Sequence, residues 1–303
     1  MTDFAGPAER GPGVTGPDVT GPGVTGPGAT GPGATGSRVP GASRPGDAAG
    51  WPPPAPGAAP LARMIRAEAG LELRFLLRNG EQLLLTLIIP VLLLLAFGHE
   101  PLVAIHGSRI DFVVPGILAL AVLSTAFTSQ AISTGFERRY GVLKRLGATP
   151  LSRGGLIGAK TLTVLAVEVL QVVIICALGA VLGWRPDTSP AGVAFAVALL
   201  LAGTAAFSGL ALLLAGTLRA EATLAAANLI YLVMLGIGGV LFPLARFPAG
   251  IRPELRLLPA GALADGLRAT LAHGGGLPGL DLLVLLAWAV AAIAIAARTF
   301  RWE

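Results

Sequence analysis

Six long stretches of the chain carry almost no charge, and this feature restricts the fold more than any other. They cover about residues 82–99, 112–136, 161–184, 191–216, 222–245 and 280–297. A helix that crosses a bilayer needs about 20 residues, within a range of roughly 17–25. The stretches therefore predict six transmembrane helices in an all-α membrane protein.

Composition points the same way. Of the 303 residues, 53% are hydrophobic and only 13% are charged, and the mean hydropathy is +0.74. Soluble domains carry about 25% charged residues, so this chain could not cover the surface of a soluble enzyme. The net charge of +5 does not indicate nucleic acid binding, because the basic residues are scattered between the apolar stretches. Such a surplus is typical of cytoplasmic loops.

The residues that usually build metal or catalytic sites are sparse. Cys176 is the single cysteine, and His99, His106 and His273 are far apart, so no metal site is expected. No catalytic triad or carboxylate pair can be assembled, which argues against an enzyme. Residues 158–161, Gly-Ala-Lys-Thr, lack the glycines of a phosphate-binding loop, so this chain is not expected to bind ATP itself.

The first 60 residues differ from the rest. Residues 11–35 repeat a pentad, GPGVT GPDVT GPGVT GPGAT GPGAT, and residues 36–60 keep a similar composition. The period is wrong for collagen, and no side chain of the repeat is large enough to form a core. We expect residues 1–60 to be a disordered tail, either a tether or a docking segment, ahead of a transmembrane domain at 61–303. The first ten residues lack the features of a signal peptide.

An amphipathic helix is expected over residues 61–80, before the first span. Its arginines fall within about a third of the helix circumference, and such a helix suits the headgroup layer of a bilayer. They are Arg63, Arg66, Arg74 and Arg78.

The loops set the orientation. With both termini in the cytoplasm, the inner segments hold 13 basic residues and the outer segments hold six. The inner ones are Arg63, Arg66, Arg74, Arg78, Arg138, Arg139, Lys144, Arg145, Arg153, Lys160, Arg219, Arg298 and Arg301, and the outer ones are Arg109, Arg185, Arg246, Arg252, Arg256 and Arg268. The excess inside favours cytoplasmic termini.

The connection between the second and third spans contains a short basic segment. Glu137 to Leu146 has a helix-forming composition, with Gly147 as its stop and Pro150 beyond. Arginines and lysine surround apolar side chains there, which suits docking into a groove of another protein. The alternative is a loop that only sets the orientation of the spans.

Polar residues inside the spans are few. Glu168 and Gln171 lie on one face of the third helix. A charge there is costly, so this pair lines a substrate path or a helix interface, or Glu168 is neutralised locally without a role in transport. Asn228 is a further candidate for the substrate path or a helix interface. Asn228, Thr204 and Ser208 are expected to form hydrogen bonds between helices.

The outer connection, residues 246–281, contains three prolines and predicts short helices against or within the outer leaflet. Leu263, Leu267 and Leu271 recur every four residues. The segment is expected to be a structural cap or a lid rather than a catalytic element.

Taken in order, four stretches resemble the type-2 ABC transporter permease family, and in particular actinobacterial daunorubicin-resistance-type drug exporters. The resemblance covers roughly residues 62–302 and excludes the repeats. The stretches are the Arg-rich helix, DFVVPGILAL at 111–120, ERRYGVLKRLGATPLSR at 137–153, and residues 242–275, which resemble an outer helical hairpin before the last span.

The resemblance implies a permease dimer that binds no cofactor of its own, with ATP and Mg held by a separate ABC ATPase subunit. The basic segment would be the coupling helix, and the substrate path would lie at the dimer interface among the first, second and fifth spans. The coupling residues would be Glu137, Arg138, Arg139, Gly141, Lys144, Arg145 and Leu146.

The resulting hypothesis is an export permease of the bacterial plasma membrane that moves a hydrophobic or amphipathic, drug-like molecule outward. A permease for polysaccharide or lipid-linked glycan is the alternative, weakly disfavoured by the aromatic content of 6%. An ion-driven carrier would need broken helices and several charges in the membrane, which the sequence lacks.

Overall fold

The computed structural model describes residues 59–78, 80–99, 109–147, 153–186, 188–272 and 278–299. The chain divides into two units, Met1–Pro56 and Gly57–Glu303, and all described residues belong to the second. Every regular element within the described ranges is a helix, which confirms the all-α fold. The predicted tail lies outside these ranges except for its last two residues.

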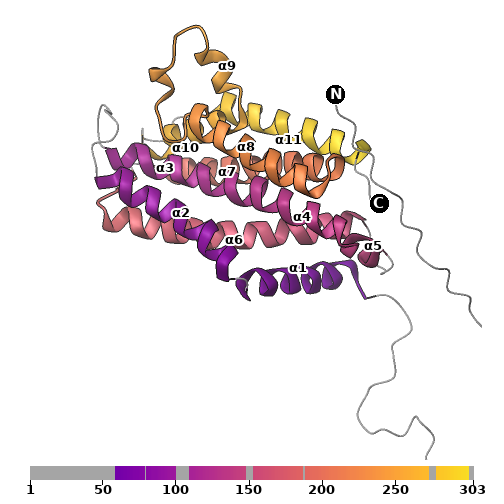
Figure 1. Cartoon of the computed structure of the whole chain (residues 1–303). Coiled ribbons are helices and arrows are strands. Elements are labelled where there is room, and N and C mark those ends of the chain that lie inside the picture. Colours follow the sequence, from indigo (N-terminus) through magenta and orange to yellow (C-terminus); the bar gives the residue numbers. More distant parts are fainter. Residues whose placement is uncertain are drawn as a thin grey trace, which may run out of the picture. The chain divides into compact units, whose positions relative to one another are not determined.

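Each of the six predicted spans contains a helix (Figure 1). They are α2 (Gly80–His99), the continuous run of α3 (Arg109–Val122), the π-helix η1 (Leu123–Ser129) and α4 (Gln130–Arg139), then α6 (Arg153–Val181), α7 (Pro190–Thr217), α8 (Ala220–Ile237) and α11 (Gly279–Thr299). In the described ranges, five of them are long and apolar enough to cross a membrane. The apolar part of α2, Thr86–Gly98, is shorter, so the count of six spans stays a prediction.

The run from α3 to α4 forms the core of the bundle. Residues 113–122 are all buried, because α3 packs against α2, α6, α7 and α10. Small residues bring other helices close together. A Cβ added to Gly209 of α7 would lie 2.9 Å from the Cβ of Ala292 on α11. Helices in lipid associate through such close contacts between small residues, because the hydrophobic effect does not drive their association there.

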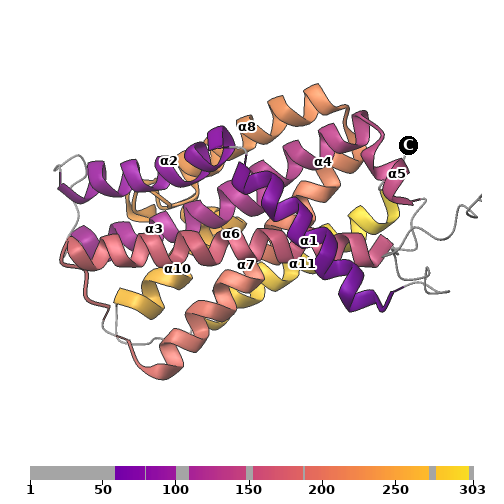
Figure 2. The same ribbon diagram turned by 90° about the horizontal axis from the view of Figure 1, so that it is seen from below.

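The helix predicted over residues 61–80 is present as α1 (Leu61–Arg78), which lies across α6 (Figure 2). Ala69 is buried against α6, where the hydroxyl of Thr163 donates to its carbonyl at 3.4 Å. The four arginines of α1 are all exposed. The helix therefore has one face on the bundle and a basic face away from it.

Two expectations for the second half of the chain need correction. The helix of the predicted fifth span ends at Ile237 rather than near 245, because Gly239 adopts a φ of +69° and Pro243 follows. The outer connection forms α9 (Arg252–Arg256) and α10 (Pro259–Ala272), and α10 packs against α3, α7 and α11 instead of lying only on lipid. Its repeated leucines form a buried face, as Leu263 and Leu267 are fully buried.

Candidate functional site: a basic elbow and its polar anchors

The basic segment after the second span is an elbow rather than one helix. The single helix expected over 137–146 is wrong, since α4 ends at Arg139 and α5 (Val142–Gly147) follows after a turn. Gly141 occupies the turn with a φ of +68°, and its amide donates to the carbonyl of Arg138 at 3.1 Å. A glycine in the left-handed region is a common way to end a helix, and here it redirects the chain. We call residues 137–147 the elbow.

Two arginines of the elbow bind the neighbouring helices. The guanidinium of Arg138 donates to the carbonyls of Gly216 and Leu218, at the end of α7, the first at 2.8 Å. A cation is favourable beside the free carbonyls of a helix C-terminus. Arg139 forms an ion pair with Glu221 in the first turn of α8. The end of α4 is thus attached to both α7 and α8.

The other side of the elbow is exposed. Lys144 and Arg145 are both exposed, and the side chain of Tyr140 is 64% exposed. Leu143 is 2% exposed and anchors α5 to the bundle, while Leu146 is half-buried. Among the predicted coupling residues, Lys144 and Arg145 are thus exposed, whereas Glu137 and Arg138 contact the rest of the bundle.

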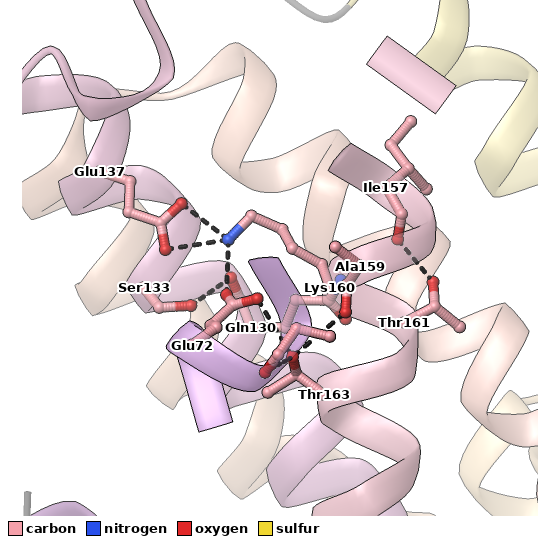
Figure 3. A network of polar contacts seen from close by, with 10 residues as sticks. Glu72, Gln130, Ser133, Glu137, Ile157, Ala159, Lys160, Thr161 and Thr163 are labelled. Carbon is pink, nitrogen blue, oxygen red and sulfur yellow. Dashed lines mark hydrogen bonds and ion pairs between the residues drawn. The ribbon is translucent and has the colours of Figure 1, made fainter. Parts of the chain in front are cut away.

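Glu137 belongs to a buried network around Lys160 (Figure 3). The Nζ of Lys160 lies 2.9 Å from Oε1 of Glu72 and 2.7 Å from Oε2 of Glu137, and Lys160 is 5% exposed. Thr163 extends the network, because its hydroxyl donates to Oε2 of Glu72 at 3.2 Å. Lys160 thus links α6 to α1 and α4 beside the elbow. It lies within the helix α6, whereas the lysine of a phosphate-binding loop lies in a glycine-rich turn.

The intramembrane pair of α6 lies at interfaces between helices of the chain's own bundle. Glu168 is 6% exposed, and its Oε2 accepts a hydrogen bond from Thr204 of α7 at 2.6 Å. Gln171 accepts from the hydroxyl of Thr125 at 3.0 Å and donates to the carbonyl of Thr86 at 3.0 Å. Gln171 therefore ties α6 to η1 and α2, and Glu168 ties α6 to α7.

The expected hydrogen bonds between helices are only partly found. Thr204 forms one, as described above. Asn228 does not: its side chain is exposed and donates to the carbonyl of Leu224 on its own helix, at 3.0 Å. Its exposed position on α8 explains this, because no other helix in the described ranges covers it. The hydroxyl of Ser208 is buried and has no hydrogen-bond partner among the described residues.

Changing Glu168 to Gln should leave both transport and stability nearly unchanged. An amide oxygen can still accept from Thr204, and no ion pair in the described part of the chain includes Glu168. We expect a change below about 1 kcal/mol in the free energy of unfolding. Substrate transport and detergent unfolding measured on the same preparation would check this. A large loss of transport with unchanged stability would instead place Glu168 on the substrate path.

A second buried cation lies at the opposite end of the bundle, on α10. The guanidinium of Arg268 donates to the carbonyls of Gly239 and Val240, both at 2.7 Å, and stacks over the ring of Phe112 at 3.7 Å. Burial lowers the pKa of Arg268 to about 10, against the opposing effect of Asp265, so the group stays charged at neutral pH. Arg268, on α10, therefore links the residues just after α8 to α3.

Sequence reasoning assigned neither Lys160 nor Arg268 to a site, since both were read as loop charges. A signal was present in each case. Lys160 opens an apolar stretch, and Asp265 precedes Arg268 by three positions on one helix face. Glu72 is an acid in a helix dominated by arginines. These signals did not indicate that Lys160 would pair with Glu72, or that Arg268 would also donate to backbone carbonyls after α8.

The apolar helices define a multi-pass membrane protein, and the exposed basic elbow lies at one end of its bundle. The chain belongs to the ABC-2 type transporter family, whose sequence model matches residues 70–272. No curated protein matches the chain significantly. Membership makes the chain the permease subunit of an ABC transporter, and the family implies an ABC ATPase as partner.

Proposed function

We propose that this permease exports a hydrophobic or amphipathic small molecule from a bacterial cell, driven by ATP and Mg on a separate ATPase subunit. Both termini would lie in the cytoplasm of the plasma membrane. The observation that carries the proposal is the elbow. Its Lys144 and Arg145 are exposed to a cytoplasmic partner, and it is attached to α7 and α8 through Arg138 and Arg139. A movement of the ATPase against the elbow would therefore be transmitted directly to α7 and α8.

A dimer of the permease would place the substrate path between protomers. α8 is the least buried of the candidate spans, with exposed Leu229 and Leu232, and α2 exposes Ile88 and Leu92. The second span is mostly buried within its own protomer. We therefore assign the path to α2 and α8 rather than to the first, second and fifth spans together. Their apolar side chains favour an apolar or amphipathic substrate over a glycan.

The test begins with the native complex. The tagged chain is purified in detergent from its own membranes, and the ATPase that copurifies in stoichiometric amount is identified by mass spectrometry. Transport is then measured in vesicles with the purified complex. Reversing both exposed charges, as Lys144→Glu with Arg145→Glu, should weaken ATPase binding by about ten-fold or more, because like charges would then face each other at the interface.

The matched control reverses two exposed arginines at the other end of the bundle, Arg185→Glu with Arg246→Glu. This variant should bind the ATPase normally. If the elbow variant inserts in the membrane and still couples ATP hydrolysis to export, the elbow is not the contact. A chain that moves solute without any ATPase would contradict the proposed function itself.

A further inference from the structure

A groove of about 380 Å³ lies between α6 and α11, at the end of the bundle that carries α5. Leu156 and Ile157 of α6 form one wall, and Ile293 and Ala297 of α11 form the other. Ile157 is 43% exposed and Ile293 is 50% exposed, both on candidate membrane-spanning helices. The groove is therefore apolar, open along a surface that lipid would cover, and within the size range of small-ligand pockets.

Two buried hydroxyls in the groove have no partner. Ser208 of α7 is 6% exposed and Thr134 of α4 is 1% exposed, and neither hydroxyl is hydrogen-bonded within the described residues. Hydroxyls in apolar helices commonly donate to a carbonyl one turn back, as Thr204 does to Leu200 at 2.8 Å. Buried polar groups without partners are rare. An acceptor atom of a ligand would satisfy both hydroxyls.

The charge around the groove indicates the class of ligand. Arg298, in the last turn of α11, directly follows the lining residue Ala297 and is exposed. Cations at a membrane surface attract anionic headgroups. An apolar channel, two hydroxyl donors and an exposed cation near its end match the acyl chain, ester carbonyl and phosphate of one phospholipid molecule.

We propose that the groove binds one acyl chain of an anionic phospholipid, whose ester carbonyl accepts hydrogen bonds from Ser208 and Thr134. The site lies inside a single protomer, between helices that differ from those assigned to the substrate path. It does not depend on the proposed export function. The lipid would brace α6 against α11 close to the elbow.

The experiment uses the full chain in nanodiscs of phosphatidylcholine that contain a phosphatidylglycerol with a diazirine in one acyl chain. After illumination, the labelled residues are mapped by mass spectrometry. We expect labelling of the groove walls to exceed that of the exposed face of α6 at Val169 and Val173. Ser208→Ala should lower groove labelling by about five-fold, the value of one neutral hydrogen bond.

Two further variants separate occupancy from misfolding. Ala205→Phe fills the groove and should abolish labelling there, whereas Leu201→Phe, on the exposed face of the same helix, should leave it unchanged. A phosphatidylcholine probe with the same chain should label the groove less than phosphatidylglycerol does. The proposal is overturned if the groove is labelled no more than Val169 and Val173 of α6, if Ser208→Ala has no effect, or if the two headgroups label equally.

Discussion

Replacing Lys160 with methionine should lower the free energy of unfolding by about 3–5 kcal/mol, the usual cost of removing one partner from a buried ion pair. The substitution leaves the carboxylates of Glu72 and Glu137 close together without the cation between them. The helices that they join, α1 and α4, should then separate from α6. Unfolding of the purified permease in detergent, followed by circular dichroism against denaturant, measures the loss.

The matched variant removes all the charges, as Glu72→Gln, Lys160→Met and Glu137→Gln together. It should recover most of the stability, because replacing a whole buried ion pair by neutral groups is often close to neutral. Failure of the triple variant to recover would mean that packing of the lysine stem, rather than charge, holds the helices. A loss below about 1 kcal/mol for Lys160→Met would contradict the network's structural role.

Replacing Arg268 with methionine should have an effect of similar size, about 3–5 kcal/mol. The carbonyls of Gly239 and Val240 would lose their donor, and Asp265 would lose its closest cation. The chain just after α8 should loosen first. Hydrogen exchange resolved by peptide should therefore rise over residues 238–244 in this variant, together with the loss in unfolding free energy.

Arg256 provides the control, because it approaches the same Asp265 at 4.0 Å while its side chain is 65% exposed. Exposed pairs contribute little, so Arg256→Met should change the unfolding free energy by less than about 1 kcal/mol. Equal losses for the two arginines would show that Asp265 matters and the carbonyl contacts do not.

The length and position of the helices could be predicted because they depend on local properties. In lipid, an apolar stretch of about 20 residues must form its backbone hydrogen bonds within itself, and it therefore folds as a helix. The amphipathic pattern of α1 likewise predicted its exposed arginines, whereas the repeat of Leu263 and Leu267 indicated an apolar helix face but not that other helices would bury it. The break at Gly141 was missed because the residues on both sides of it favour helix.

The candidate site was predicted in part. The basic composition of the elbow predicted either a docking surface or a loop that only sets the orientation of the spans, and the exposed Lys144 and Arg145 fit both. Composition could not separate them from Arg138, whose partners are backbone carbonyls of α7. Asn228 shows the reverse case, since a polar residue in a span was expected to face another helix and instead lies on an exposed face.

Hydropathy along the chain was thus enough to establish an all-helical membrane protein and the ends of most of its helices. The polar partners required the folded protein: Lys160 meets Glu72 from 88 positions away, and Arg268 meets Phe112 from 156 positions away. The physical reason is that helix formation is decided within a few turns, whereas a contact between helices depends on how each is rotated and packed. In an apolar bundle, that packing determines which charges are buried together.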